Sequence, residues 1–309
     1  MQIATLFTKD KNGKLDDILI GFDNIKDHEE LSANQGVTVG RYANRIAKGR
    51  FIIDGKEYEA KHNENETCLH GGDEFAKAVW NAEIVSDNAV KFTYFSADGT
   101  CGFPGNLDVS ITYTLEEDAL RLDYFAISDK KTVLNFTNHA YFNLGGYASG
   151  DMLGHILTID ADKFTPIDEN SIPTGELRNV EGTPFDFRLP KAIGKDIKAD
   201  YEQLINPRGY DHNFCINDPS LEKPCAAVTE PNTGRKLEVY TDLPGVQLYC
   251  GNFLAGERGK KGAVMNQYYG FCLETQFWPD SPNQKGFSNC VFDKNEKFET
   301  TTIYKFPKI

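Results

Sequence analysis

The sequence predicts a chain built mainly of antiparallel β-strands, arranged as a sandwich or a barrel. Apolar and polar residues alternate from Val90 onward, which is the period of two that a half-buried strand produces. No long segment carries the apolar period of an amphipathic helix, and glycine and proline interrupt the chain throughout. Alternating strand–helix units are therefore disfavoured, and no fixed-period repeat of the propeller type is present.

The clearest predicted strand runs from Leu107 to Leu115, where every second residue is apolar and the others are Asp, Ser or Thr. A charged turn at residues 116–118 leads into a second strand at residues 120–124, as in an antiparallel hairpin. Similar short runs predict further strands along the chain. They cover Phe51–Tyr58, Leu134–Leu144, Arg235–Thr241, Val246–Phe253 and Phe271–Phe277.

The segment from Pro173 to Pro207 is rich in loop signals, and we expect a short helix near Lys191–Ala199 within it. Its composition is not that of a flexible linker. A chain of 309 residues allows about two domains, but β-sandwiches often exceed this length rule as one unit. We therefore predict one domain over residues 1–309.

The charge balance and the cysteines limit the classes of partner. The chain has 46 acidic and 33 basic side chains, a net charge of -13, which repels phosphate and disfavours nucleic acid. No stretch approaches the ~20 apolar residues of a membrane span, and residues 1–10 do not resemble a signal peptide. The seven cysteines lack metal-ligand spacing and suit a reducing compartment, so we expect a cytoplasmic protein without a metal site.

His139 is the first candidate for proton transfer. It shares its parity with Asn135, Thr137 and Tyr141, so a strand would place it on a polar face that could line a site. Histidine exchanges a proton near neutral pH, which suits a general acid or base. The residues are equally compatible with a structural histidine bonded to a neighbour in a polar layer.

Glu274 is the second candidate, because it is the one charged residue in the predicted strand Phe271–Phe277. An unpaired carboxylate is costly to bury, so it belongs either to a salt bridge or to a site that uses its charge. The strand alone slightly favours the salt bridge.

Three further polar residues lie next to glycine or aromatic residues. Arg45 ends the string GRYANR, His70 lies in LHGG and Asp211 lies in YDH. Sugar sites combine fixed hydrogen-bonding groups with aromatic faces, although each residue also fits a turn or surface position. The motifs GxSxG, GxxxxGK[ST], HExxH and GxGxxG are absent, which removes the chemistries they signal.

With these residues in view, the chain resembles the galactose mutarotase (aldose 1-epimerase) family over nearly its whole length. The resemblance rests on seven strings that occur in the family's order. They are GRYANRIAKGRF (40–51), LHGG (69–72), SADGTCGFPG (96–105), TNHAYFNLGG (137–146), YDHNF (210–214), PGVQLYCGNF (244–253) and FCLETQFWPDSPN (271–283).

The resemblance implies one large antiparallel β-supersandwich that acts on a free aldohexose such as galactose or glucose, without a cofactor, as a monomer or homodimer. It makes His139 the proton donor and Glu274 the base. The residues that it implies for binding the sugar or tuning these two groups are Asn44, Arg45, His70, Tyr141, Asp211 and Gln247. The chain departs from the family at Phe277-Trp278, where the family commonly has His then Phe. This difference affects the expected packing beside Glu274 and the expected substrate preference.

The implied reaction removes the proton from the C1 hydroxyl and protonates the ring oxygen, so that the sugar opens, turns at C1 and closes. We expect His139 to begin protonated and Glu274 ionised, with His70 and Arg45 stabilising the developing charge. No redox step is involved. Two rivals are an epimerase of hexose 6-phosphates, disfavoured by the acidic balance, and a non-catalytic sugar-binding module, disfavoured by the presence of both proton-transfer groups.

Overall fold

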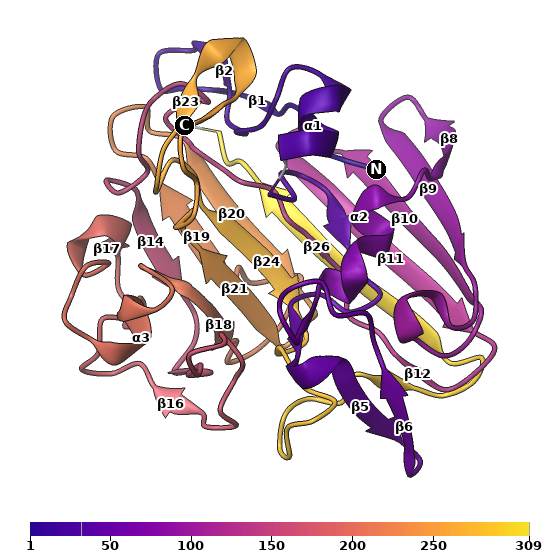
Figure 1. Cartoon of the computed structure of the whole chain (residues 1–309). Coiled ribbons are helices and arrows are strands. Elements are labelled where there is room, and N and C mark those ends of the chain that lie inside the picture. The colour runs from indigo at the N-terminus through magenta and orange to yellow at the C-terminus, as the bar shows by residue number, and fades with distance from the viewer. Residues whose placement is uncertain (32, 309) are drawn as a thin grey trace.

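The computed structural model describes residues 1–31 and 33–308, and most of its strands gather in two antiparallel sheets (Figure 1). Within those residues the larger sheet has nine strands, in the order β17-β14-β19-β20-β26-β11-β10-β9-β8. Their bounds are β8 (Asn81–Ser86), β9 (Ala89–Ser96), β10 (Leu107–Leu115), β11 (Ala119–Ser128), β14 (Ile156–Ile159), β17 (Lys191–Ala192), β19 (Ala226–Thr229), β20 (Lys236–Thr241) and β26 (Lys297–Lys305).

The smaller sheet of the described residues has five strands, in the order β16-β15-β18-β21-β24. Their bounds are β15 (Lys163–Phe164), β16 (Arg178–Asn179), β18 (Asp211–Cys215), β21 (Gly245–Tyr249) and β24 (Cys272–Gln276). This sheet lies in front of the β19–β20 part of the larger one in Figure 1.

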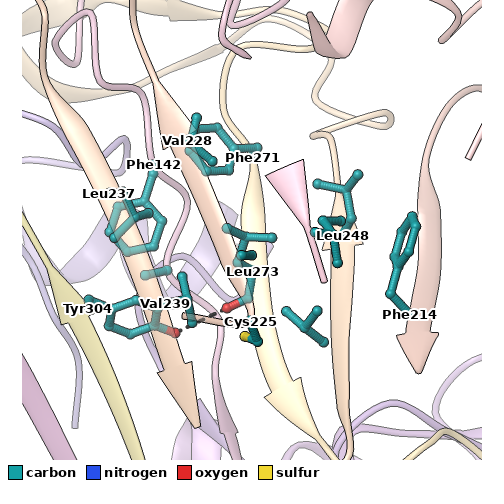
Figure 2. Close-up of a cluster of buried hydrophobic side chains, with 14 of the residues drawn as sticks. Phe142, Phe214, Cys225, Val228, Leu237, Val239, Leu248, Phe271, Leu273 and Tyr304 are labelled. Carbon is teal, nitrogen blue, oxygen red and sulfur yellow. Dashed lines mark hydrogen bonds between the residues drawn. The ribbon is translucent and has the colours of Figure 1, made fainter. Parts of the chain in front are cut away.

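The apolar core fills the space between the two sheets. Figure 2 shows Val239 of β20 and Tyr304 of β26 on one side, and Leu273 of β24 and Leu248 of β21 on the other. The Tyr304 hydroxyl donates to the Leu273 carbonyl at 3.3 Å, which ties the sheets together. Burying each large apolar side chain contributes about 1.5–3 kcal/mol. The predicted all-β sandwich is confirmed.

The β10–β11 hairpin follows the predicted alternation. Its register places Ile111 opposite Tyr124, and both are buried in the core. The predicted charged turn at residues 116–118 joins the two strands. The confirmed pairing shows that the period of two is reliable where one sheet face is buried and the other is polar.

The remaining elements are short. Paired short strands are β1 (Phe7–Lys9) with β2 (Leu15–Asp17), β3 (Thr38–Val39) with β13 (Thr137–Asn138), β4 (Arg45–Ile46) with β7 (Cys68–Leu69), β5 (Arg50–Ile53) with β6 (Lys56–Glu59), β12 (Thr132–Val133) with β25 (Val291–Phe292), and β22 (Glu257–Arg258) with β23 (Val264–Met265). The α-helices in the described residues are α1 (Ile25–Leu31), α2 (Glu74–Lys77) and α3 (Glu202–Ile205). None of these described helices has the length and hydropathy of a membrane span.

Three local predictions differ from the structure. The run Phe51–Tyr58 is two strands, because Asp54 and Gly55 take left-handed φ values of 50° and 80° and reverse the chain. The run Leu134–Leu144 has only β13 as a regular pair, and the rest makes isolated bridges. The helix expected near Lys191–Ala199 is wrong: β17 and a 3-10 turn occupy this stretch, and α3 follows it.

Candidate active site

The alternation of side chains along β24 separates the core from the candidate site. Leu273 and Thr275 face the larger sheet, where Thr275 Oγ1 lies 2.5 Å from Thr302 Oγ1. Successive side chains of a strand point to opposite faces. Glu274 therefore lies on the outer face of the smaller sheet, together with Cys272, which precedes it by two positions.

Strand register extends this outer face across the smaller sheet. On β21, Gln247 lies opposite Glu274, and Tyr249 lies opposite Cys272. On β18, Asp211 lies opposite Tyr249. Antiparallel partners share a face, so three of the predicted site residues, from three strands, point to the same side of the sheet.

His139 reaches this face from the segment that follows β13. Its N–H donates to the Val37 carbonyl at 2.8 Å, and its carbonyl accepts from the Gly36 N–H at 2.9 Å. His139 Nε2 lies 3.6 Å from Oε1 of Glu274. The side chains are only 8% and 3% exposed, so the predicted acid and base form one buried pair. The prediction of a regular strand at His139 is wrong, but its polar-side placement beside Glu274 is what the structure has.

His70 is held against this pair by a tight turn. It has a left-handed φ of 52°, and Gly71 follows with a φ of 68°. A side chain at Gly71 would place Cβ 2.2 Å from the Gly40 carbonyl oxygen, so only glycine fits. The turn brings the His70 ring edge-on to His139, with ring centroids 5.3 Å apart.

The backbone of Asn44 sets the tautomer of His70. The Asn44 N–H donates to His70 Nδ1 at 3.2 Å, and the Asn44 carbonyl accepts from the His70 N–H at 2.9 Å. Burial, followed by the charges of His139 and Arg45, holds the pKa of His70 well below its ordinary value. The neutral ring therefore accepts at Nδ1 and carries its proton on Nε2, where it can donate to a ligand.

This tautomer also bears on metal binding. Ligand atoms of His70, His139 and Glu274 lie within 4.8 Å of one another, a spacing that a metal ion could bridge. A metal-bound histidine normally donates its other N–H to an acceptor. The other nitrogen of His70 instead faces a backbone N–H donor, so the contacts favour hydrogen bonding over coordination.

Arg45 forms the rim of the site through a network of charges. Its Nε and Nη2 donate to the two oxygens of Glu64 at 2.6 and 2.8 Å, and Nη1 lies 3.9 Å from Asp211 Oδ2. Gln247 Nε2 donates to Asp211 Oδ1 at 2.7 Å. Burial opposes the guanidinium charge, but the two carboxylates outweigh it and raise the pKa of Arg45.

An open cavity of about 530 Å³ adjoins this rim. Arg45 and Glu64 line it together with residues of the loop 168–172. The cavity thus touches the site at Arg45, and neither His139 nor Glu274 lines it.

Two predicted binding residues use their side chains differently from a direct sugar contact. The Tyr141 hydroxyl donates to the Ala33 carbonyl at 3.0 Å, and its ring stacks on His139 with centroids 5.0 Å apart. The Asn44 side-chain oxygen accepts from the Arg45 N–H at 2.9 Å. These contacts position the predicted acid and the rim of the site.

The family departure at Phe277-Trp278 lies at the end of β24. Trp278 Nε1 donates to the Pro244 carbonyl at 2.9 Å, and its ring packs edge-on against Phe287. The Phe277 N–H donates to Asn135 Oδ1 at 2.8 Å. These contacts fix the wall next to the site, and none of them involves Glu274.

The electrostatics of the pair bear on the charges that the reaction is expected to need. Burial, then the charge of Asp211, raises the pKa of Glu274 well above its ordinary value, while Arg45 opposes the shift. Burial lowers the pKa of His139 to about 4. Burial thus opposes both charges that the reaction is expected to need, a protonated His139 and an ionised Glu274.

Comparisons with known proteins identify the family of the chain. The chain matches the aldose 1-epimerase family profile over residues 2–305. The chain belongs to the aldose 1-epimerase family. It is 45% identical over 306 residues to the galactose mutarotase of Rattus norvegicus, covering 98% of this chain and 88% of the rat protein. It is 40% identical over 282 residues to the aldose 1-epimerase of Haemophilus influenzae, covering 90% of this chain and 81% of that protein.

The fold of this aldose 1-epimerase family member also matches solved structures. A crystal structure of an aldose epimerase homologue from C. elegans superposes with a TM-score of 0.91 at 30% identity, over 100% of this chain and 93% of the other. The resemblance predicted from the seven strings is therefore confirmed.

Sequence reasoning missed three residues of the site. Glu64 lies in a run of charged and polar residues that looks like any exposed loop, although it binds Arg45 through both oxygens. Tyr249 and Cys272 share the parity of Gln247 and Glu274 on their strands, which is a signal that could have found them.

Proposed function

We propose that this protein interconverts the α and β anomers of free aldohexoses such as galactose and glucose, with His139 as the acid and Glu274 as the base. The observation that carries the proposal is the state of the Glu274 carboxylate. Its Oε1 faces His139, and its Oε2 is buried with no hydrogen-bond partner among the described residues. A buried polar atom without a partner is costly, and a sugar hydroxyl would satisfy it.

In the proposed reaction, the carboxylate of Glu274 removes the proton from the C1 hydroxyl. The electrons of that O–H bond form the aldehyde, the bond between C1 and the ring oxygen breaks, and the ring oxygen takes a proton from His139. Rotation at C1 followed by the reverse steps closes the ring on its other face. Each positioned proton-transfer group contributes typically about 10²–10⁴-fold to the rate.

The pKa shifts of the pair fit this cycle. In the charged pair His139 is protonated and Glu274 is ionised, and in the neutral pair the proton is on Glu274. Both pairs hold one proton, and ring opening converts the charged pair into the neutral pair. Burial favours the neutral pair, which is the state reached when the sugar is open. Sugar hydroxyls that donate to the carboxylate would favour the charged form, so that both states become accessible during turnover.

We assign the polar groups around the pair to holding the sugar. His70 would donate from Nε2, while Arg45, Asp211 and Gln247 form a connected row along the rim. Asn44 and Tyr141 position this set through their contacts with Arg45 and His139. The network is also a reason to favour free sugars over phosphorylated ones, because the Arg45 guanidinium is already paired with Glu64 and Asp211.

Several finer points are part of the same proposal. We propose that one domain spans residues 1–309, that the enzyme needs no cofactor or metal, and that it works in the cytoplasm as a monomer or homodimer without nucleic-acid partners.

Polarimetry on freshly dissolved α-D-galactose and α-D-glucose tests the function. The purified protein should speed the approach to the equilibrium rotation well beyond the spontaneous rate in the same buffer. Galactose 6-phosphate and glucose 6-phosphate serve as comparison substrates. An unchanged spontaneous rate with the free sugars, or acceleration with the phosphorylated sugars alone, would contradict the proposal.

A further inference from the structure

A buried thiol lies against the candidate acid on the side away from the candidate base. Cys272 Sγ is 3.5 Å from Nδ1 of His139, within hydrogen-bonding distance for sulfur. The other ring nitrogen, Nε2, faces Glu274 at 3.6 Å. Cys272 and Glu274 are two positions apart on β24 and share its outer face, so one strand contacts both ends of the imidazole.

The surroundings keep this thiol protonated. Cys272 is fully buried, and burial, followed by the charge of Glu274, raises the pKa of its thiol well above the ordinary value. A thiol can donate its S–H weakly and can also accept weakly at sulfur. Cys272 is therefore unsuited to nucleophilic chemistry and suited to a hydrogen bond of either direction.

Proton donation by His139 requires a particular arrangement of its hydrogens. In a neutral imidazole one nitrogen carries hydrogen, and the partner of the other nitrogen decides which. If Nδ1–H donates to the sulfur, the lone pair of the neutral ring lies on Nε2, toward Glu274. This is the tautomer that remains after Nε2 has given its proton to the ring oxygen. When His139 becomes an imidazolium, Nδ1 keeps its hydrogen, and the same sulfur still accepts it.

We propose that Cys272 is a positioning residue whose sulfur accepts from Nδ1–H of His139, which holds the neutral ring in the tautomer with a free Nε2 and serves both protonation states of the ring. A carboxylate at this place would favour the imidazolium alone, whereas the neutral sulfur supports the neutral ring as well. The inference rests on the proposed role of His139 as the acid.

The neighbouring aromatic residues do not replace this contact. Tyr141 stacks on the His139 ring at 5.0 Å, and Tyr249 approaches it edge-on at 6.2 Å. These rings restrict the plane of the imidazole, but they offer its Nδ1 neither a donor nor an acceptor along the ring plane. The orientation of the His139 ring and its tautomer are thus held by different contacts.

Three substitutions separate the hydrogen bond from packing. Cys272→Ser keeps a group that can donate and accept, Cys272→Val keeps the volume without it, and Cys272→Ala removes both. Cys225→Ala is the matched control, because Cys225 is also a buried, free cysteine and lies in the core between the sheets (Figure 2). Loss of the partner that orients a metal-bound histidine typically costs about 10–100-fold in activity, and we expect the lower end of this range for His139.

Polarimetry should show kcat reduced about tenfold or more in Cys272→Val and Cys272→Ala, with KM little changed. Cys272→Ser should stay within about threefold of the wild type, and Cys225→Ala should match the wild type at temperatures where both are folded. Wild-type kcat in Cys272→Val would overturn the proposal, as would equal losses in the serine and valine variants.

Nitrogen-15 NMR of the histidine rings at neutral pH gives a readout that packing alone would not move. The His139 signal is assigned by its disappearance in His139→Asn. We expect a protonated Nδ1 and an unprotonated Nε2 in the wild type and in Cys272→Ser, and a mixture of tautomers in Cys272→Val. An unchanged tautomer in Cys272→Val would overturn the proposal even if the rate falls. This measurement needs no turnover, so it remains decisive if the protein does not epimerise sugars.

Discussion

His139 Nε2 and Glu274 Oε1 lie 3.6 Å apart in a buried pair, a distance longer than a normal hydrogen bond. Neither atom is fully committed to the other, so each keeps capacity for an oxygen of the sugar. The pair carries one proton through the proposed cycle, and this relationship determines how activity and stability should respond to pH and to substitution.

The pH dependence of kcat/KM should lack the inflection of an ordinary histidine near pH 6.5. The pair keeps its single proton between the lowered pKa of His139, about 4, and the raised pKa of Glu274. After subtraction of the spontaneous rate, kcat/KM measured by polarimetry should fall as the pH drops toward 4, the pKa of His139, and should show no step near pH 6.5. A fall centred near pH 6.5 would show that the free enzyme does not hold its proton in this way.

Glu64 should matter for sugar affinity because it holds Arg45 through both carboxylate oxygens. We expect Glu64→Gln to lower kcat/KM about tenfold, mainly through KM, since a partly buried charge-assisted pair is lost. Glu57→Gln is the control, because Glu57 approaches Arg50 at 4.0 Å in an exposed pair that contributes about 0–1 kcal/mol. Equal kinetics for both variants would remove Glu64 from the binding rim.

The turn at His70 should not accept a side chain at Gly71. Gly71→Ala would place Cβ 2.2 Å from the Gly40 carbonyl oxygen and 2.4 Å from the Arg41 nitrogen, so the backbone must move and displace His70. Urea unfolding should show a loss clearly above the roughly 1–2 kcal/mol of left-handed strain, and the folded variant should lose activity.

Gly55→Ala separates the strain from the clash. Gly55 has a φ of 80°, but an added Cβ would meet nothing within 4 Å. This variant should lose only the strain energy and keep full activity. If Gly71→Ala and Gly55→Ala are equally stable and equally active, the close approach at Gly71 does not position His70.

The free energy of unfolding should fall as the pH drops below 6.5, in part because of His212. Its ring accepts from the Asp211 N–H at Nδ1 and meets Gln203 at Nε2, and burial lowers its pKa to about 3. The unfolded chain takes up a proton below pH 6.5 while the folded chain does not, so stability is lost as the pH falls toward 3. At pH 5 this single residue should account for about 2 kcal/mol.

Urea unfolding at pH 7 and pH 5 measures this effect. His212→Asn should be less stable than the wild type at pH 7. Between pH 7 and pH 5, its free energy of unfolding should fall by about 2 kcal/mol less than that of the wild type. A wild-type pH dependence in His212→Asn would contradict the assignment.

The predictability of the fold from sequence varied with the surroundings of each segment. The β10–β11 hairpin was predictable because one of its faces is buried and the other polar, which imprints a period of two. The run Leu134–Leu144 was not, because both of its faces are buried and tertiary contacts shape its backbone. Its parity still placed His139 apart from its apolar neighbours.

The residues of the candidate site also differ in how far the sequence predicts them. Each of His139 and Glu274 was ambiguous in its own strand, and only the ordered family strings predicted that they act together. Glu64 left no local signal, because the partner that explains it, Arg45, is fixed by folding. Cys272 was overlooked because a free cysteine in an apolar strand usually indicates core, whereas here strand parity turns it toward His139.

The most direct test of the central claim is the polarimetric rate of Glu274→Gln and of His139→Asn on α-D-galactose. Circular dichroism should first show that both variants keep the wild-type fold. Each substitution should then lower kcat by about 10²–10⁴-fold, because each removes one of the two proton-transfer groups. Wild-type activity in either folded variant would contradict the account of a proton shared between His139 and Glu274.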